Sequence, residues 1–338
     1  MGNSTFIITA SAQYLSQGLS ELQEADGSVR AVKLLDNGIA IIETEQEKPG
    51  FIRLIKIKSP VFIRHINAVD YIIDIKEAGL QKIAETVGKY AGMAPGQRIA
   101  VQVRKGSGDY PYSPLDVKNA VDAVLAESIA AVPEIKEPEQ IISILLCGEK
   151  CYIGLGTPDE NISAWSGGMM HFKKSENDIS RAKYKLMEAI AVFHIDMRSF
   201  RSALDLGAAP GGWTSVLLEH GLQVTAVDTG DMDDRLYKYP GFRFIKTNAS
   251  ELELAKDSFD LLTSDVSWNP KNTARLIVNA SEYLKAGGTA VVTLKLMGDK
   301  VRKTIKEVLV LYKEVFEILE VRQLFHNRDE VTLYLRKR

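Results

Sequence analysis

The stretch Asp205-Leu206-Gly207-Ala208-Ala209-Pro210-Gly211-Gly212-Trp213 decides the fold of the second half of the chain. It joins a short apolar strand, expected over 203–206, to a helix expected over 212–220. Its three glycines let the backbone come close to a ligand where a side chain would collide. A helix begins directly afterwards, so its free N–H groups can bind a carboxylate. The glycines are not spaced as G-x-G-x-x-G, and Pro210 stiffens the loop, which favours a nucleoside carrying an amino acid over a pyrophosphate.

From about residue 179 onward, short apolar strands alternate with helices. We expect strands over 203–206, 224–227, 242–246, 259–264, 289–294, 315–324 and 330–336, and helices over 212–220, 272–285 and 300–313. This alternation predicts a mainly parallel sheet with helices on both faces. The last two strands are too close together for a crossover and should form an antiparallel hairpin. The pattern therefore predicts an α/β, Rossmann-like domain over 179–338, whose seven-stranded sheet has an antiparallel last strand.

The first 178 residues show a different pattern of expected strands and helices. Residues 1–50 combine short strands with one helix and predict a small domain. Residues 51–157 predict an α+β region, with extended segments, two helices and a hairpin; these elements are expected over 51–58, 61–66, 79–88, 98–104, 116–127, 141–146 and 151–155. The polar stretch 158–178, which contains Gly167-Gly168, is typical of a linker.

Two further strand ends complete a predicted nucleoside site. Asp228 ends the second strand, about twenty residues after the glycine loop, where a carboxylate can accept hydrogen bonds from both ribose hydroxyls. A helix cap or a solvated loop is the alternative role for this residue. Asn248 follows the third strand and could accept a hydrogen bond from an adenine amine. The predicted cofactor-binding residues are Asp205, Gly207, Ala208, Pro210, Gly211, Gly212, Trp213, Asp228, Asn248 and Asp265, although the Trp213 side chain is itself expected in the core.

Four charged residues are placed to meet at one edge of the sheet. Asp265 ends the fourth strand, Lys295 ends the fifth, Glu330 begins the last strand, and Lys185 lies in a helix before the first strand. Carboxyl ends of parallel strands gather beside the ligand, and an antiparallel strand begins at that same edge. Alone, each residue is more often a surface charge or half of an ion pair. Together they predict a catalytic site.

The glycine loop and the ordered Lys185, Asp265, Lys295 and Glu330 resemble the FtsJ-type (RrmJ-like) ribose 2′-O-methyltransferases, whose K-D-K-E tetrad has this order. The resemblance covers roughly 179–338 and implies a class I methyltransferase fold with S-adenosylmethionine as cofactor. The segment 323–332 and the long N-terminal extension are most similar to the RlmM type, which carries a THUMP domain and methylates a cytidine ribose of 23S ribosomal RNA. This resemblance implies that 51–157 is a THUMP-like RNA-binding domain and that 1–50 is the small ferredoxin-like domain preceding it. Two positions depart from the family pattern: Asn248 replaces an acidic residue, and the loop 266–270 differs.

The tetrad also fits the chemistry that the resemblance implies. A ribose 2′-hydroxyl is a poor nucleophile, so removal of its proton assists attack on a methyl group. We predict that Lys295 is the general base, that Lys185 supplies a like charge lowering its pKa, and that Asp265 orients the Lys295 amine. Since a carboxylate raises a lysine pKa, the two neighbours act in opposite directions. Glu330 would position Lys185 or the ribose.

The chain has 45% hydrophobic and 25% charged residues, a composition typical of a soluble globular protein. It contains no apolar run long enough for a bilayer and no N-terminal secretory pattern, so we expect a cytoplasmic protein without a membrane partner. Cys147 and Cys151 match no metal-binding pattern, so no metal is expected. The oligomeric state is left open by the sequence.

A net charge of −2 argues mildly against a nucleic-acid partner, so RNA binding must use local basic surfaces. Candidate phosphate contacts are Lys173, Lys174, Arg181 and Lys183, with Arg53, Arg64, Arg104 and Lys105 in the N-terminal half. Trp268 and Tyr184 are candidates for stacking on a base.

Two alternatives stay open. A methyltransferase of another substrate class would share the glycine loop and Asp228, but it has no need of two lysines and a glutamate at the sheet edge. Base N-methyltransferases typically carry Asn/Asp-Pro-Pro-aromatic after the fourth strand, whereas this chain has Asp265-Val266-Ser267-Trp268. A non-catalytic RNA-binding protein with the same fold would have no use for the paired charges.

Overall fold

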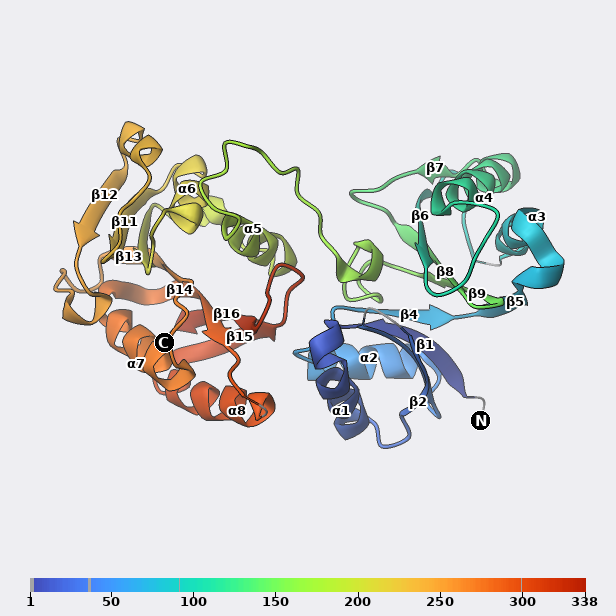
Figure 1. Ribbon diagram of the computed structural model, residues 1–338, viewed down its shortest axis with the longest axis horizontal. Coiled ribbons are helices and arrows are strands. Elements are labelled where there is room, and N and C mark those ends of the chain that lie inside the picture. Colours follow the sequence, from blue (N-terminus) through green and yellow to red (C-terminus); the bar gives the residue numbers. More distant parts are fainter. Residues whose placement is uncertain (1–2, 36–37, 91, 299) are drawn as a thin grey trace. The chain divides into compact units, whose positions relative to one another are not determined.

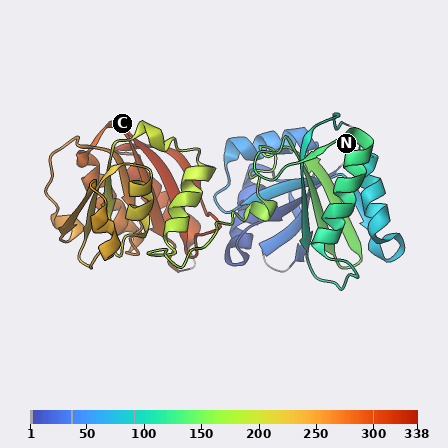
Figure 2. The same ribbon diagram turned by 90° about the horizontal axis from the view of Figure 1, so that it is seen from above.

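The protein is described by a computed structural model, which covers residues 3–35, 38–90, 92–298 and 300–338. The chain divides into two compact units, Met1–Met170 and His171–Arg338. Figure 1 labels the elements of each unit, and Figure 2 shows them from a second direction.

The C-terminal unit contains one mixed sheet. Its strands are β10 (Ser202–Leu206), β11 (Gln223–Asp228), β12 (Phe242–Lys246), β13 (Phe259–Ser264), β14 (Leu284–Lys295), β15 (Phe316–Arg322) and β16 (Glu330–Lys337). They are ordered β12-β11-β10-β13-β14-β16-β15, and β16 runs antiparallel to both of its neighbours. The seven predicted strands and the antiparallel last strand are thus confirmed.

Helices cover both faces of this sheet. They are α5 (Lys183–Val192), α6 (Gly212–Glu219), α7 (Pro270–Ala280) and α8 (Val301–Tyr312), with 3-10 turns η4 (Met197–Ser199), η5 (Asp234–Lys238), η6 (Ala249–Glu251) and η7 (Ser281–Tyr283). In Figure 1, α5 and α6 lie on one face and α7 and α8 on the other. The start of α7 shows how the local sequence determines where a helix begins. Asn269 accepts a hydrogen bond from the Lys271 N–H, and Pro270 occupies the first turn. Leu186, Val216 and Leu217 pack from α5 and α6 into the core.

The N-terminal unit begins with a four-stranded sheet of order β2-β3-β1-β4. The elements follow as β1 (Ser4–Thr9), η1 (Ala12–Tyr14), α1 (Leu15–Ala25), β2 (Arg30–Leu35), β3 (Ile39–Thr44), α2 (Lys48–Lys58) and β4 (His65–Val69). This βαββαβ sequence is ferredoxin-like. Because β4 pairs with β1, the ferredoxin-like fold continues to Val69, and the predicted boundary at residue 50 is corrected.

The segment 51–58 is helical, so the predicted extended conformation was wrong. Its β-branched residues suggested a strand, but Pro49 lies in the first turn of α2. Phe51, Ile52 and Ile55 are buried together on one side of the helix, and this packing outweighs β-propensity.

A second sheet, of order β5-β9-β8-β6-β7, follows in the N-terminal unit. Its elements are β5 (Tyr71–Asp74), α3 (Ile75–Gly88), β6 (Arg98–Lys105), α4 (Pro114–Ile129), β7 (Val132–Pro133), β8 (Gln140–Cys147) and β9 (Lys150–Gly156). The predicted hairpin is present as β8 and β9. Leu145, Cys147 and Tyr152 of this sheet pack against Ile7 and Ile41 of the first, so the two sheets share a core. The α+β layout agrees with the expectation, while its THUMP identity stays a prediction.

The expected linker 158–178 is instead packed at both of its ends. The Asn161 carbonyl accepts from the Ile66 N–H at 3.2 Å, and the Ala164 carbonyl accepts from Gln102 Nε2 at 2.6 Å. A 3-10 turn, η3 (Ser166–Gly168), follows within the N-terminal unit. In the C-terminal unit, the Phe172 ring stacks on Tyr184. The segment therefore joins the two compact units, and each end packs against the unit to which it belongs.

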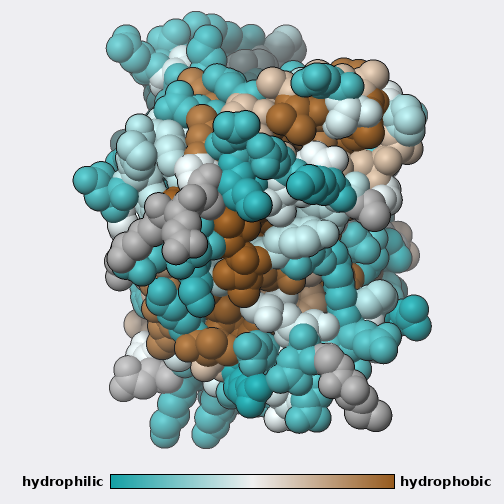
Figure 3. Space-filling model, turned by 90° about the vertical axis from the view of Figure 1, so that its right-hand side faces the viewer, coloured by the Kyte–Doolittle hydropathy of each residue, from teal (hydrophilic) through white to brown (hydrophobic). Residues whose placement is uncertain are grey.

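On the face shown in Figure 3, hydrophobic side chains gather in patches among hydrophilic ones. Within the described ranges, no helix has both the length and the apolar character that crossing a membrane requires. The same ranges hold no cluster of His, Cys, Asp and Glu suited to a metal ion.

Candidate active site

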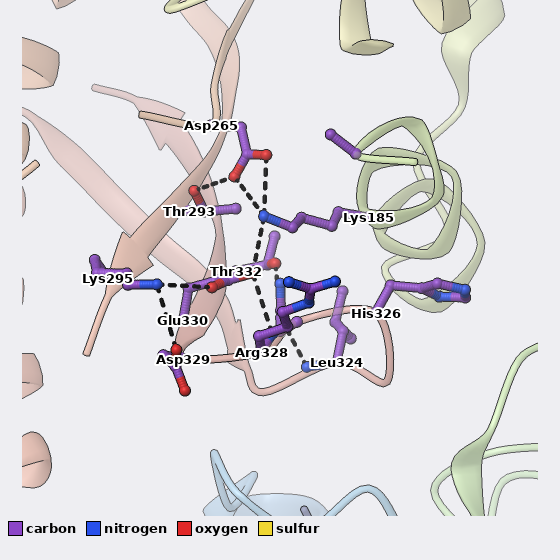
Figure 4. A network of polar contacts seen from close by, with 12 residues as sticks. Lys185, Asp265, Thr293, Lys295, Leu324, His326, Arg328, Asp329, Glu330 and Thr332 are labelled. Carbon is purple, nitrogen blue, oxygen red and sulfur yellow. Dashed lines mark hydrogen bonds and ion pairs between the residues drawn. The ribbon is translucent and has the colours of Figure 1, made fainter. Parts of the chain in front are cut away.

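Lys185, Asp265, Lys295 and Glu330 meet at the carboxyl edge of the sheet, as the sequence predicts (Figure 4). Lys295, the last residue of β14, is the register partner of Glu330, the first residue of β16. Asp265 follows β13 directly, and Lys185 lies in the first turn of α5. Four segments that are distant in sequence thus supply one polar cluster.

Lys185 is the centre of this cluster. Its Nζ lies 3.0 Å from each carboxylate oxygen of Asp265 and 2.8 Å from Glu330 Oε1. Burial alone would lower the pKa of Lys185, but the carboxylates of Asp265 and Glu330 raise it above its ordinary value. Lys185 is therefore an ammonium at neutral pH, and it holds the two carboxylates together.

Lys295 is less tightly held. Its Nζ lies 3.5 Å from Asp329 Oδ2 and 3.9 Å from Glu330 Oε2, and its side chain is 32% exposed against 19% for Lys185. Of the two amines, Lys295 has the greater freedom to contact a substrate. Glu330 lies between the lysines, with one oxygen toward each.

The predicted pairing of Asp265 with Lys295 was wrong. Asp265 binds Lys185 and accepts a hydrogen bond from Thr293 Oγ1 at 2.7 Å. Burial raises the pKa of Asp265, while the Lys185 ammonium and the Thr293 hydroxyl oppose that rise. The reason is geometric, because α5 places Lys185 between Asp265 and Glu330. Glu330 forms an ion pair with Lys185 at 2.8 Å, and its predicted positioning role stays a prediction.

A pocket of about 270 Å³ lies beside the cluster at the ends of β10, β11 and β13. Its lining residues are Gly207, Val227, Asp228, Thr229, Thr247, Asn248, Ala249, Asp265, Val266, Ser267 and Trp268. Asp228 accepts from the Ala209 N–H at 3.0 Å and from the Gly230 N–H at 2.7 Å, so it also fixes the glycine loop. Asn248 Oδ1 already accepts from the backbone and hydroxyl of Ser250.

Much of the predicted cofactor loop supports this pocket without lining it. Among the described residues, the pocket lining includes Gly207, Asp228, Asn248 and Asp265, but none of Asp205, Ala208, Pro210, Gly211, Gly212 and Trp213. Trp213 is buried, and its indole N–H donates to the Ala182 carbonyl at 3.0 Å. A Cβ on Gly211 would lie 2.3 Å from Leu236 Cδ1, and one on Gly212 would lie 3.0 Å from Ser180 Cβ. Packing within the protein therefore disfavours a side chain at both positions.

Gly211 offers a test of that packing against a matched control. Gly211 has φ of 115° and would clash with Leu236, whereas Gly221 has φ of 82° and no atom near its missing Cβ. Gly211→Ala should lower the free energy of unfolding by at least about 2 kcal/mol, and Gly221→Ala by only about 1 kcal/mol, because overpacking adds to backbone strain at position 211. Urea denaturation of both variants measures the difference. Equal losses of unfolding free energy would show that the Leu236 side chain moves aside at little energetic cost.

Asp205 is a buried structural carboxyl, which corrects its predicted contact with the cofactor. It is 1% exposed and accepts from Thr214 Oγ1 at 2.6 Å and Thr263 Oγ1 at 2.8 Å. These bonds tie β10 to α6 and β13. Burial raises the pKa of Asp205 to about 7, although both hydroxyls act to lower it.

This raised pKa predicts a pH-dependent stability. Between its unfolded pKa and about 7 the native state binds the extra proton, so stability present at low pH is lost as the pH rises through 7. Relative to Asp205→Asn, which keeps the shape, the wild type should lose up to about 4 kcal/mol of unfolding free energy between pH 4 and pH 8. Denaturant titrations across this pH range measure the difference in unfolding free energy between the two proteins. A difference that does not change with pH would contradict the prediction.

A groove of about 610 Å³ lies on the other side of the cluster. It is lined by His171, Phe172, Lys174, Arg181, Ala182, Tyr184, Lys185, Ser267, Lys295, Phe325, His326, Asn327, Arg328 and Glu330. Ser267 lines both the groove and the smaller pocket, so the two hollows adjoin at the charged cluster. Lys174 and Arg181, both predicted phosphate contacts, lie in this groove.

Several predicted RNA contacts have other partners. Lys183 Nζ lies 3.0 Å from Asp178 Oδ1, and the buried Tyr184 donates its hydroxyl to the same carboxylate. Tyr184 is 3% exposed, so the predicted stacking on a base is corrected. Arg104 is half-buried and donates to Thr9 Oγ1 at 2.8 Å, a contact within the protein. Trp268, at 42% exposed, lines the smaller pocket.

Sequence reasoning missed the aromatic side of the groove and the glutamate behind it. His171, Phe172, Phe325 and His326 form ring contacts at centroid distances of 5.1–5.4 Å. Glu188, in α5, is 2% exposed and accepts from the Phe325 and His326 N–H groups, each at 2.8 Å. A glutamate one turn after Lys185 was the signal that could have found it, because both residues then share one face of the helix.

The strand order, the glycine loop after β10 and the carboxylate at the end of β11 define a class I, S-adenosylmethionine-dependent methyltransferase. Residues 179–326 match the FtsJ-like methyltransferase family. The resemblance predicted from the glycine loop and the tetrad is thereby confirmed.

Named relatives extend the similarity beyond this domain. Ribosomal RNA large subunit methyltransferase M of Halorhodospira halophila is 32% identical over 207 residues, which cover 60% of this chain and 59% of that protein. The protein of the same name from Cellvibrio japonicus is 26% identical over 347 residues, covering 94% of each chain. Among solved structures, TrmN from Thermus thermophilus gives a TM-score of 0.41 at 14% identity, covering 99% of this chain and 100% of that one.

The residues of the smaller pocket fit S-adenosylmethionine. Asp228 offers carboxylate lone pairs at the position where ribose hydroxyls are bound in such folds. The exposed face of Trp268 and the amide of Asn248 offer apolar and polar surface for a base.

Proposed function

We propose that this protein methylates a ribose 2′-hydroxyl of large-subunit ribosomal RNA. The observation that carries the proposal is the meeting of two lysines and two carboxylates between a nucleoside-sized pocket and a groove with basic and aromatic walls. The names of the relatives, which are ribosomal RNA methyltransferases, support the same substrate. Neither a protein nor a small-molecule substrate requires such a groove.

The side chains of the cluster have separate roles in this proposal. Bound S-adenosylmethionine supplies an electrophilic methyl group. Lys295 accepts the proton of the 2′-hydroxyl, since it is the less constrained amine and lines the groove. Lys185 remains charged and holds Asp265 and Glu330 in position.

The N-terminal unit is proposed to bind RNA and so bring the target to the groove. Its second fold region, β5 to β9, is the proposed THUMP-like domain, and its ferredoxin-like region precedes it. Arg53 and Lys105 are exposed and remain candidates for phosphate contacts. A location in the cytoplasm, where ribosomal RNA is made and assembled in bacteria, follows from this substrate.

Transfer of label from tritiated S-adenosylmethionine tests the function. The substrate is large-subunit ribosomal RNA from a strain that lacks the gene, offered as naked RNA and within particles. An alkali-resistant labelled dinucleotide supports ribose methylation, because a 2′-O-methyl group blocks cleavage of the adjacent phosphodiester. Label in a free base or in protein rejects the proposal, and absence of any label favours a non-catalytic RNA-binding role.

A further inference from the structure

Phe325 is an aromatic side chain of the groove whose position is unusually well fixed. It lies in the connection between β15 and β16, half-buried, and lines the groove together with Lys185, Lys295 and Glu330. Its ring meets the His171 ring at 75° and the His326 ring at 81°, with centroid distances of 5.3 and 5.1 Å. Edge-to-face contacts of this kind hold a ring in one orientation.

The backbone beneath Phe325 is held by Glu188. The carboxylate accepts from the Phe325 N–H, the His326 N–H and the His326 Nδ1, each at 2.8 Å, and Glu188 is only 2% exposed. A buried carboxylate is tolerated because these donors replace its lost water. Glu188 lies one turn after Lys185 in α5, so the same helix fixes both Phe325 and the catalytic cluster.

The remainder of the connection is also tied down. Asn327 Oδ1 accepts from the Leu324 N–H at 2.8 Å and from Thr332 Oγ1 at 3.0 Å. Glu330 Oε1 accepts from the Arg328 N–H at 3.1 Å, so the connection ends on a residue of the cluster. Phe325 is thus held at a defined place relative to Glu330, and it is preorganised for a ligand.

We propose that Phe325 is the surface on which the base of the target nucleotide stacks, and that Glu188 is its positioning residue. The inference rests on the proposed ribose methylation. A ribose that reaches Lys295 brings its own base into the same groove, where an aromatic face is a sequence-tolerant partner. A base inside a duplex has both faces covered by its neighbours, so the target nucleotide must be unpaired and out of its stack.

The test uses the full-length protein and an RNA fragment in which the labelled ribose has first been mapped. Phe325→Leu keeps the apolar packing but removes the aromatic face, and Phe325→Trp restores such a face. Phe325→Leu should raise KM for RNA about tenfold, with a smaller effect on kcat and an unchanged affinity for S-adenosylmethionine, and Phe325→Trp should recover most of the loss. Tyr237→Ala, an exposed aromatic in η5, is the matched control.

A second arm pairs the target nucleotide with a complementary oligonucleotide, which should reduce methylation of that position at least tenfold. Glu188→Gln should raise KM in the same direction as Phe325→Leu, and combining the two should add little, because both act through one ring. The inference is overturned if Phe325→Leu behaves as Tyr237→Ala, or if the paired target is methylated as fast as the free one. Absence of ribose methylation by the wild type would instead reject the proposed function itself.

Discussion

Lys295→Ala should reduce kcat for methyl transfer by a factor of about 10³, the size expected for removal of a general base. Affinity for S-adenosylmethionine should change little, since Lys295 lines the groove and is not among the residues of the smaller pocket. The fold should also persist, because the Lys295 side chain is 32% exposed and its nearest carboxylates lie at 3.5 and 3.9 Å. Single-turnover methylation and equilibrium cofactor binding measure the two quantities separately.

Lys303→Ala provides the matched control, because this lysine is 69% exposed on α8 and is paired there with Glu307. Lys303→Ala should leave kcat for methyl transfer and the affinity for S-adenosylmethionine unchanged. The Lys295→Ala rate should rise as the pH is raised, because hydroxide in solution then replaces the missing base. Retention of more than a tenth of the wild-type kcat would remove Lys295 from this role.

The sequence was most informative about the edge of the sheet. Strand ends are specified locally, by apolar runs that stop at Asp228, Asp265 and Lys295, and the topology of parallel sheets then brings these ends together. The position of Glu330 followed from the short hairpin, because an antiparallel strand begins where its neighbour ends. The register of β14 and β16 confirms the predicted position of Glu330, since Lys295 and Glu330 are cross-strand partners. The fold and the meeting of these charged side chains were therefore predictable.

The pairing inside the site was not predictable, because it depends on where α5 sits over the sheet. A shift of α5 by one turn would place Glu188, in place of Lys185, near Asp265, and no local pattern decides between these positions. The same limit explains why the burial of Asp205 was not predicted. Its place between Thr214 and Thr263 arises from contacts among three separate elements. Helix α2 was missed because its β-branched residues pack on a sheet that only the full fold creates.

Lys185→Met should lower the free energy of unfolding by about 3 kcal/mol and abolish methylation as well. The substitution keeps the length of the side chain but leaves Asp265 and Glu330 facing each other without their shared cation. Without that ammonium, the pKa of Asp265, already raised by burial, rises further. The loss should therefore be greatest at neutral pH and shrink as the pH falls and Asp265 binds a proton.

A double variant separates stability from catalysis at this position. Lys185→Met with Asp265→Asn removes one charge of each sign, so it should recover most of the lost stability, whereas methylation should stay absent because Glu330 has lost the amine that positions it. Chemical denaturation of the wild type, both single variants and the double variant gives the coupling energy between the two side chains. A coupling near zero would mean that the 3.0 Å contact contributes nothing to stability, and that Lys185 serves the reaction alone.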